Sequence, residues 1–469
     1  MSDAVLNDKK SPFDRSLVEG PIGPAVWKLA WPTMLQNVIA GLQGVIDHIL
    51  VGNLLGYTAN AAIGVSWQIF LVVIVFMASL FTGQAVLVAR FAGAGDSDRV
   101  NKTVQQALVT AIALYFIVAP IGYFSTPFLL DFANASPAVR ALALPFLRVN
   151  FTFSIGMLMF FMLTSALRAA GDARTPMRLG VSMTILNVIL NVILIRGLGP
   201  VPALGTMGSA LGTVIASSTV SLYALYQLLK GRLVIKLSRH MDWRPDWAIV
   251  RSLFRFGLPT GVQGIAMNIA GVMLLRFIGS LGQSAEAQGA YAIGYTELFS
   301  LITWTSVGLM GAAATIAGQN LGAGQPDRVM QGVTTASRIG LGVAAGVGFM
   351  FVAFPGALLW LFGANDQPAV STIARQLLQY LAVSGFFITL ALTYTGGLQG
   401  TGDTRSPLFI TLASQIAVPI GMCTVIQATR QLQPGDIWLA IVLGHFTRCV
   451  LTVARFRQAK WRTISVVLH

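Results

Sequence analysis

Long apolar runs, separated by short polar connections, repeat along almost the whole chain of 469 residues. A bilayer core of about 30 Å is crossed by a helix of about 20 apolar residues, and each run is long enough for one crossing. We therefore expect an all-α polytopic membrane protein. The pattern predicts twelve transmembrane helices, at residues 25–51, 63–90, 103–125, 140–167, 176–196, 207–229, 251–279, 288–318, 332–362, 372–398, 407–427 and 437–456.

The composition agrees with this pattern and excludes a soluble domain. Hydrophobic residues make up 55% of the chain and charged residues only 10%, whereas soluble domains average about 25% charged residues. The two cysteines, Cys423 and Cys449, both lie in apolar runs, so neither a disulfide framework nor a cysteine-based zinc site is expected. The first 24 residues are polar and lack the apolar core of a removable signal peptide.

The positive charges, which give a net charge of +14, are unevenly divided between the two sides of the predicted spans. Of the 31 Lys and Arg residues, 24 lie on the side of the amino terminus, six lie on the opposite side, and Arg448 lies within a span. Because Lys and Arg concentrate in cytoplasmic loops, we expect both termini to be cytoplasmic and the protein to be multi-pass in the plasma membrane, the inner membrane of a bacterium. The cations are dispersed from loop to loop, so a nucleic-acid partner is not expected.

The two halves of the chain resemble each other. Residues 89–100 match residues 318–329 at six of twelve positions, and residues 166–177 match residues 397–408 at five of twelve. Each half has six spans, so the repeats run in the same direction and imply a pseudo-twofold axis along the membrane normal. We expect two six-helix lobes, with an N-lobe at 25–230, a cytoplasmic linker at 231–250, a C-lobe at 251–456, and cytoplasmic tails at 1–24 and 457–469.

Two acidic residues, Asp47 and Glu297, lie within predicted spans. Ionisable groups inside a membrane are costly, and they are therefore functional candidates. In span 1, Gln36, Ala40, Gln43 and Asp47 follow one another at intervals of 4, 3 and 4 residues, which places them on one side of the helix. Such a polar stripe should face a cavity or another helix, because lipid cannot satisfy it.

Further polar residues of the N-lobe extend this candidate site. Asn187 and Asn191 share one face of span 5, and Thr213 adds a hydroxyl in span 6. With Asp47 they form an oxygen-rich set, which suits a hard cation such as sodium. A desolvated carboxylate also favours its protonated form, so Asp47 could carry a proton instead. The alternative is that the two asparagines bond across helices only for packing.

Several short motifs occur in a fixed order along the chain: LAWP entering span 1, VIDHILVG at its end, LRAAGDARTP after span 4, ILNVILN in span 5, ALGTMGSALGT before span 6 and GGLQGTGDTRSP in the second half. Together they make the chain resemble the multidrug and toxic compound extrusion (MATE) family of secondary transporters. The resemblance implies outward transport of organic cations and other amphipathic compounds, driven by inward movement of sodium or protons. It also matches Asp47, Asn187, Asn191 and Thr213 to the ion site of the family's first lobe.

The C-lobe candidate is Glu297, near the middle of span 8. It could act in transport, or it could form a buried ion pair, with Arg448 as the expected partner and Arg276 as the second candidate. Other branches of the family carry acids in spans 7 and 10, where this chain has Met267 and, nearby, Ile388. Their second-lobe sodium site is therefore not expected here, and we expect a proton gradient alone to support coupling.

The function predicted is a secondary active antiporter that works by alternating access, with Pro32 able to bend span 1 because proline leaves one carbonyl without a donor. The alternative is a flippase for a lipid-linked polar substrate, which a wide and strongly basic cleft would favour. A membrane enzyme is not expected, because no HExxH helix or pair of facing aspartates is present. We expect no cofactor beyond the coupling ion, a monomeric protein, and small amphipathic or cationic molecules and the lipid bilayer as partners.

Overall fold

The computed structural model describes residues 12–238, 241–364 and 367–466, so the first part of the predicted N-terminal tail, two linker residues, residues 365–366 and the last three residues lie outside it. Within these ranges, eleven helices are long and apolar enough to cross a membrane, and a bent pair of shorter helices can supply a twelfth span. The two members of that pair meet at 53°. The prediction of an all-α polytopic membrane protein is confirmed.

The helices follow the predicted spans closely. The first half contains α1 (Ser16–Glu19), α2 (Ile22–Leu55), α3 (Tyr57–Gly93), α4 (Ser97–Phe132), the bent pair α5 (Pro137–Thr152) and α6 (Ile155–Ala169), α7 (Arg174–Arg196) and α8 (Gly205–Leu229). The second half contains α9 (Trp247–Gly279), α10 (Ser284–Tyr291), α11 (Ser300–Gly322), α12 (Pro326–Ala353), α13 (Pro355–Trp360), α14 (Pro368–Thr401), α15 (Arg405–Thr411), α16 (Val418–Thr429) and α17 (Pro434–Arg457). Two π-helical segments, η1 (Ala292–Leu298) and η3 (Leu412–Ala417), join α10 to α11 and α15 to α16, and a 3-10 turn, η4 (Lys460–Thr463), follows α17.

The predicted ninth span, residues 332–362, is too long at its end. The membrane helix α12 stops at Ala353, and the short helix α13 begins at Pro355. A proline cannot donate a backbone hydrogen bond to the preceding turn, but it fits the first turn of a new helix. The break therefore falls at Phe354, between the two.

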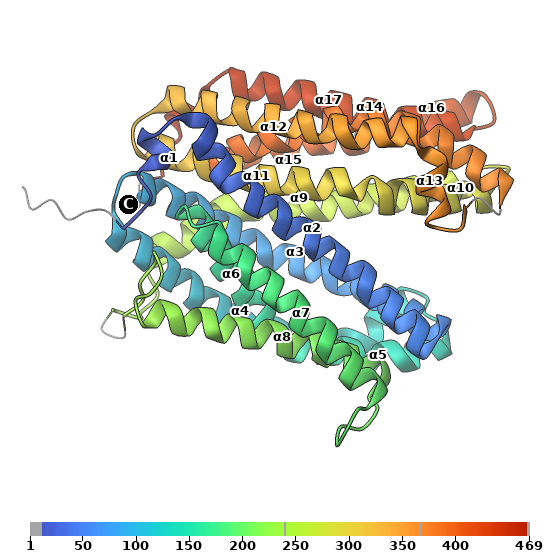
Figure 1. The fold of residues 1–469 in the computed structure, drawn as a ribbon, viewed down its shortest axis with the longest axis horizontal. Coiled ribbons are helices and arrows are strands. Elements are labelled where there is room, and N and C mark those ends of the chain that lie inside the picture. Colours follow the sequence, from blue (N-terminus) through green and yellow to red (C-terminus); the bar gives the residue numbers. More distant parts are fainter. Residues whose placement is uncertain (1–11, 239–240, 365–366, 467–469) are drawn as a thin grey trace, which may run out of the picture.

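The two halves lie together at one end of the molecule and diverge toward the other (Figure 1). The shared end, which we call the basic end, holds α1, the connections 93–97, 169–174, 229–238, 241–247 and 322–326, and residues 458–466. These are the connections to which the sequence assigned most of the cations. Contacts between the halves run from α3 to α9 and from α2 and α3 to α11.

Near the basic end, α3 and α11 cross at backbone contact. A Cβ at Gly93 would lie 1.9 Å from the carbonyl oxygen of Gln319, and a Cβ at Gly322 would lie 2.1 Å from that of Arg90. The two contacts are related by the repeat, because both pairs of positions differ by 229 residues. The first glycine of each GAG motif thus provides the close approach that joins the two halves.

The matching GD-x-R-x-P segments form turns between helices. Gly171 and Gly402 adopt φ of 98° and 96°, a region in which glycine is strongly favoured. Asp172 accepts a hydrogen bond from the backbone amide three residues later at 3.0 Å, and Asp403 does the same at 3.2 Å. Asp403 also forms a 2.8 Å salt bridge with Arg455. These segments therefore begin α7 and α15 in equivalent ways.

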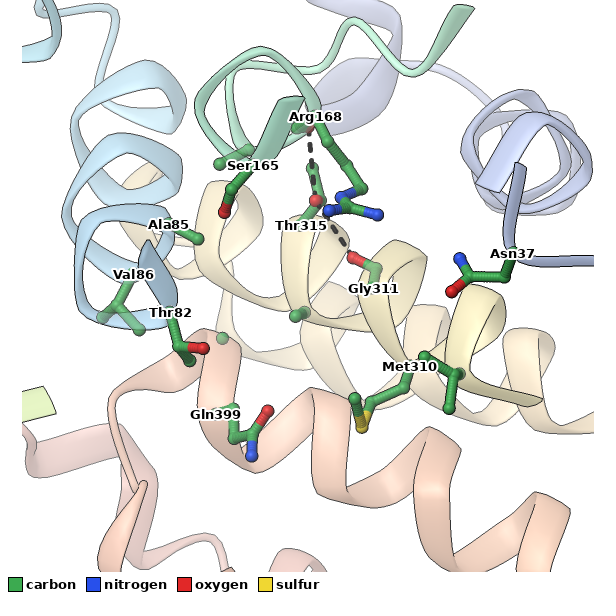
Figure 2. Close-up of a pocket in the computed structure, with 14 residues that line it drawn as sticks. Asn37, Thr82, Ala85, Val86, Ser165, Arg168, Met310, Gly311, Thr315 and Gln399 are labelled. Atoms are coloured by element: carbon green, nitrogen blue, oxygen red, sulfur yellow. Dashed lines mark hydrogen bonds between the residues drawn. The ribbon is translucent and has the colours of Figure 1, made fainter. Parts of the chain in front are cut away.

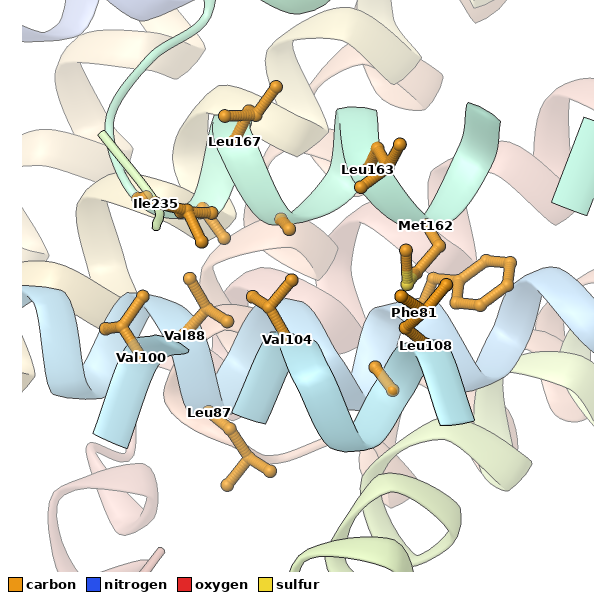
Figure 3. Packing of buried hydrophobic residues seen from close by; sticks show 14 of the residues in the cluster. Phe81, Leu87, Val88, Val100, Val104, Leu108, Met162, Leu163, Leu167 and Ile235 are labelled. Carbon is orange, nitrogen blue, oxygen red and sulfur yellow. The ribbon is translucent and has the colours of Figure 1, made fainter. Parts of the chain in front are cut away.

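The interior of the first half is apolar and closely packed. Figure 3 shows side chains from α3, α4 and α6 that meet in one cluster, among them Phe81, Val104 and Leu163. Large apolar residues also occupy the outer surface, and on α4 they are spaced by 8, 4 and 4 residues along one face: Phe116, Phe124, Phe128 and Phe132 are all exposed. A row of exposed phenylalanines along one helix face is stable against lipid rather than water.

Candidate functional site

The polar stripe predicted on span 1 faces α7. The Thr184 hydroxyl donates to Gln43 Oε1 at 2.8 Å, and the side chain of Gln36 lies against Gly180, where a Cβ would come within 3.2 Å of it. The α7 face that receives the stripe has the same spacing of 4, 3 and 4 residues: it consists of Gly180, Thr184, Asn187 and Asn191. Sequence analysis missed Gly180 and Thr184, although this shared spacing could have identified them.

Asp47 lies at the centre of the candidate site. Asn191 Nδ2 donates to Asp47 Oδ1 at 2.8 Å, and the amide of Asn187, with its nitrogen turned to the carboxylate, lies 3.1 Å from it. The same amide lies 3.0 Å from the hydroxyl of Thr213 in α8. Asn187 and Asn191 are fully buried, and Asp47 is half-buried. The structure thus brings together all four of these predicted residues.

One oxygen of this cluster has no partner. Asn191 Oδ1 is buried and makes no hydrogen bond to any described residue. It lies against α8 at Gly212, where a Cβ would come within 2.1 Å of it. A buried carbonyl oxygen without a donor is costly, and a hard cation would satisfy it. Both amides turn their nitrogens to Asp47, so the carboxylate fits a proton in this arrangement, and a sodium ion fits only after the amides rotate their oxygens toward it.

The C-lobe candidates, Glu297 and Arg448, do not form the ion pair that was expected between them. Glu297 is half-buried in η1, and Arg448 is buried in α17. Neither takes part in a salt bridge with any described residue, so the expected Glu297–Arg448 pair is absent. Glu297 lies in a π-helical segment, whose turns shift side chains from the register of a regular α-helix.

The two intramembrane histidines have ordinary hydrogen bonds. His445 is buried, its Nδ1 lies 2.5 Å from the hydroxyl of Ser384, and its ring stacks on Phe299 at a centroid distance of 5.9 Å. His48 is exposed and lies 2.6 Å from Asn60 Oδ1. Both geometries agree with packing roles.

A cavity of about 210 Å³, which was not predicted from the sequence, lies between the two halves (Figure 2). Five helices contribute to its lining, and the polar side chains include Asn37 of α2, Thr82 of α3, Arg168 of α6, Thr315 of α11 and Gln399 of α14. The sequence places Arg168 among the cations of the cytoplasmic loops. In the structure its side chain enters the cavity and reaches over α11 beside Gly311. The internal repeat could have revealed that Arg168 lies in the cavity, because Arg168 and Gln399 occupy equivalent positions in the matched segments.

A model of the MatE family matches the chain twice, at residues 32–193 and 259–424, with one segment in each half. The chain belongs to the MATE family. The resemblance found in the sequence motifs is therefore confirmed, and this MATE protein is a transporter rather than an enzyme.

Known relatives of this MATE protein match it over nearly its whole length. It is 26% identical over 440 residues to the probable multidrug resistance protein NorM of Thermotoga maritima, covering 94% of this chain and 93% of that protein. An outward-facing conformation of a multidrug resistance MATE family transporter of the MOP superfamily shares its fold with a TM-score of 0.88 at 21% identity, covering 96% of this chain and 98% of that one. A MOP superfamily transporter from Pyrococcus furiosus does so with a TM-score of 0.87 at 22% identity, covering 97% and 99%.

Proposed function

We propose that this MATE protein is a secondary active antiporter of a bacterial inner membrane, which exports organic cations and other amphipathic drugs in exchange for inward protons or sodium. The observation that carries the proposal is the Asp47 cluster, in which a half-buried carboxylate accepts a hydrogen bond from Asn191, whose buried amide oxygen has no partner among the described residues. The multidrug resistance protein of Thermotoga maritima supports the substrate class by its similarity over nearly the whole chain.

The coupling rests on one negative charge. Asp47 is satisfied by a proton or sodium ion, or by a cationic substrate coupled to the same lobe, and not by both at once. The inward ion therefore expels the substrate, and the substrate expels the ion. One-for-one exchange with a monovalent cationic drug moves no net charge, so the concentration gradient of the ion drives export. A tenfold ion gradient supplies about 1.4 kcal/mol, which maintains a tenfold gradient of the drug.

The moving units in this mechanism are the N-lobe, residues 25–230, and the C-lobe, residues 251–456. Both lobes rock about the glycine contacts of α3 and α11, so that the space between them opens alternately to each side of the membrane. Pro32 is buried within α2 and allows this helix to bend without breaking. Both chain termini remain on the cytoplasmic side.

The test is reconstitution of the purified protein in liposomes that contain ethidium, with a proton gradient or a sodium gradient imposed separately. The proposal predicts ethidium movement against its own gradient when one ion moves down its gradient, and it favours the proton. Movement that needs sodium would overturn the proton preference, and movement that ignores both gradients would overturn the antiport mechanism.

A flippase for a lipid-linked polar substrate is the second candidate. The observation that favours it is the cavity between the halves, whose lining includes Arg168 and no acidic residue among the described ones. A flippase would move a fluorescent pyrophosphate-linked polyprenol between the leaflets of the same liposomes, and an antiporter of free drugs would not.

A further inference from the structure

The cavity between the halves is built from equivalent positions of the two repeats. Residues of α3 and α11 that line it differ by 229 positions, as Thr82 and Gly311 do, and those of α6 and α14 differ by 231, as Arg168 and Gln399 do. The cavity therefore lies where the pseudo-twofold axis passes between the lobes. Its symmetry is broken in charge, because one repeat contributes an arginine where the other contributes a neutral amide.

The guanidinium of Arg168 has no counter-ion in the described part of the chain. It takes part in no salt bridge and makes no side-chain hydrogen bond there, and the cavity lining contains no acid. Its guanidinium lies beside Gly311 of α11, where a Cβ would come within 3.5 Å of it (Figure 2). Its backbone carbonyl accepts from the hydroxyl of Thr315 at 3.3 Å and from the amide of Gly171 at 2.9 Å. All five guanidinium donors are thus available to a ligand.

The chemistry around Arg168 is that of an oxyanion site. A guanidinium presents its donors in a planar fork that matches carboxylate and phosphate oxygens. Neutral donors lie in the same cavity. Asn37 and Gln399 carry amides and Thr82 carries a hydroxyl, whereas the hydroxyl of Ser165 already donates to the carbonyl of Phe81 at 3.1 Å. A positive charge in a largely apolar surrounding attracts an anion more strongly than it would in water.

We propose that this cavity binds the oxyanion group, carboxylate or phosphate, of an amphipathic substrate, with Arg168 as its charged ligand. The substrates would then include zwitterions and anionic amphiphiles in addition to cations. The cavity lies in the half of the membrane nearest the basic end, because Thr82 precedes the end of α3 at Gly93 by about 17 Å at 1.5 Å per residue. The assignment to a transported substrate rests on the proposed function, whereas the oxyanion site itself is testable without transport.

The experiment compares two dyes that differ in one group. Tetramethylrhodamine carries a free carboxylate, and its methyl ester is the same cation without that charge. Fluorescence anisotropy with the full-length protein in uncharged detergent micelles gives the Kd of each dye. The proposal predicts that the free acid binds about tenfold more tightly, the effect of one charge-assisted hydrogen-bond pair. Equal affinities, or tighter binding of the ester, would overturn it.

Variants assign the preference to the cavity. Arg168→Gln gives both repeats the same residue and should abolish the preference for the acid while changing ester binding less than about twofold. Arg174→Gln removes the same charge from an exposed position at the start of α7 and should leave the preference intact. Gln399→Glu places an acid in the cavity and should weaken binding of the free acid without removing Arg168, so the proposal stays testable if Arg168→Gln does not fold. A preference that persists in both cavity variants would contradict the proposal.

Two further arms identify the source of the oxyanion and separate this proposal from the antiport mechanism. If phosphatidylglycerol added to the micelles displaces the free acid and phosphatidylcholine does not, the site accepts a lipid phosphate, and if neither displaces it, the site selects soluble carboxylates. Both results support the site. Asp47→Asn should keep the dye preference even if it abolishes transport, because Asp47 lies in the α2–α7–α8 cluster and not in the cavity lining.

Discussion

Replacing Gly93 by alanine should weaken the contact that joins the two halves at the basic end. The added Cβ would lie 1.9 Å from the carbonyl oxygen of Gln319, whereas ordinary contacts begin at 3.4 Å. Both partners belong to long membrane helices, so α3 and α11 would have to separate by about 1.5 Å. Overpacking of this kind costs about 1–3 kcal/mol. If this cost falls on the contact, the ratio of molecules whose halves touch at the basic end to molecules whose halves have separated there changes about 5- to 150-fold.

The change is informative because helix propensity acts in the opposite direction. Alanine stabilises a helix interior by about 0.5–1 kcal/mol relative to glycine, so any loss must come from the contact between the halves. Gly346→Ala in α12 is the matched control, since a Cβ there meets nothing within 4 Å. Spin labels at the exposed residues Asp98 of α4 and Asp327 of α12 report the separation of the halves at the basic end.

Pulsed electron resonance between these labels should give one short distance in the parent protein and in Gly346→Ala. In Gly93→Ala, a second population at longer distance should appear. Both native cysteines are buried, which limits background labelling. A distance distribution that is identical in Gly93→Ala and in the control would refute the role assigned to this glycine.

Three other substitutions have distinct expected results. Gly212→Ala should abolish ion-coupled transport while the protein still folds, because its Cβ would lie 2.1 Å from Asn191 Oδ1, and transport at the parent rate would contradict the cation site. Asp246 caps α9 and pairs with Lys102, and the hydrogen bond from Lys102 lowers the pKa of its carboxyl. Its stabilising effect is therefore present above the unfolded pKa and is lost as pH falls through the folded one. Asp246→Ala should lower thermal stability at pH 7 by about 1 kcal/mol, and Asp246→Asn should lower it less because asparagine also caps. Both differences should shrink in acid, where protonated Asp246 still caps α9 but no longer pairs with Lys102. Glu297→Gln should change thermal stability by less than about 0.5 kcal/mol, since Glu297 pairs with no cation of the described chain, and a large drop would contradict this.

The fold was predictable because membrane helices are specified by local properties. Apolar length and loop charge define each span without knowledge of its neighbours, and the repeated motifs relate the halves. The exceptions arise where backbone geometry departs from a regular helix. The break at Phe354 and the π-helical segment that carries Glu297 change the end of a span and the direction of a side chain, and neither follows from hydropathy.

The candidate site was predictable in part. Asp47 and its two asparagines could be identified from spacing within single helices, since residues at intervals of three and four share a face. The cavity around Arg168 could not be identified in this way, because it is formed by five helices from both halves. Near the end of a span, an arginine that anchors a loop and an arginine that enters a cavity have the same sequence context. Only its equivalence to Gln399 distinguishes Arg168 from a loop cation.

The most direct test of the proposed coupling is the ion-driven movement of ethidium in liposomes that contain the Asp47→Asn variant. His48→Gln serves as the matched control, because His48 is the next residue of the same helix, is exposed and bonds to Asn60 outside the cluster. The account predicts that Asp47→Asn folds and inserts as the parent does but moves no ethidium under either a proton or a sodium gradient, whereas His48→Gln transports normally. Transport by Asp47→Asn at the parent rate would show that this carboxylate is not the coupling site.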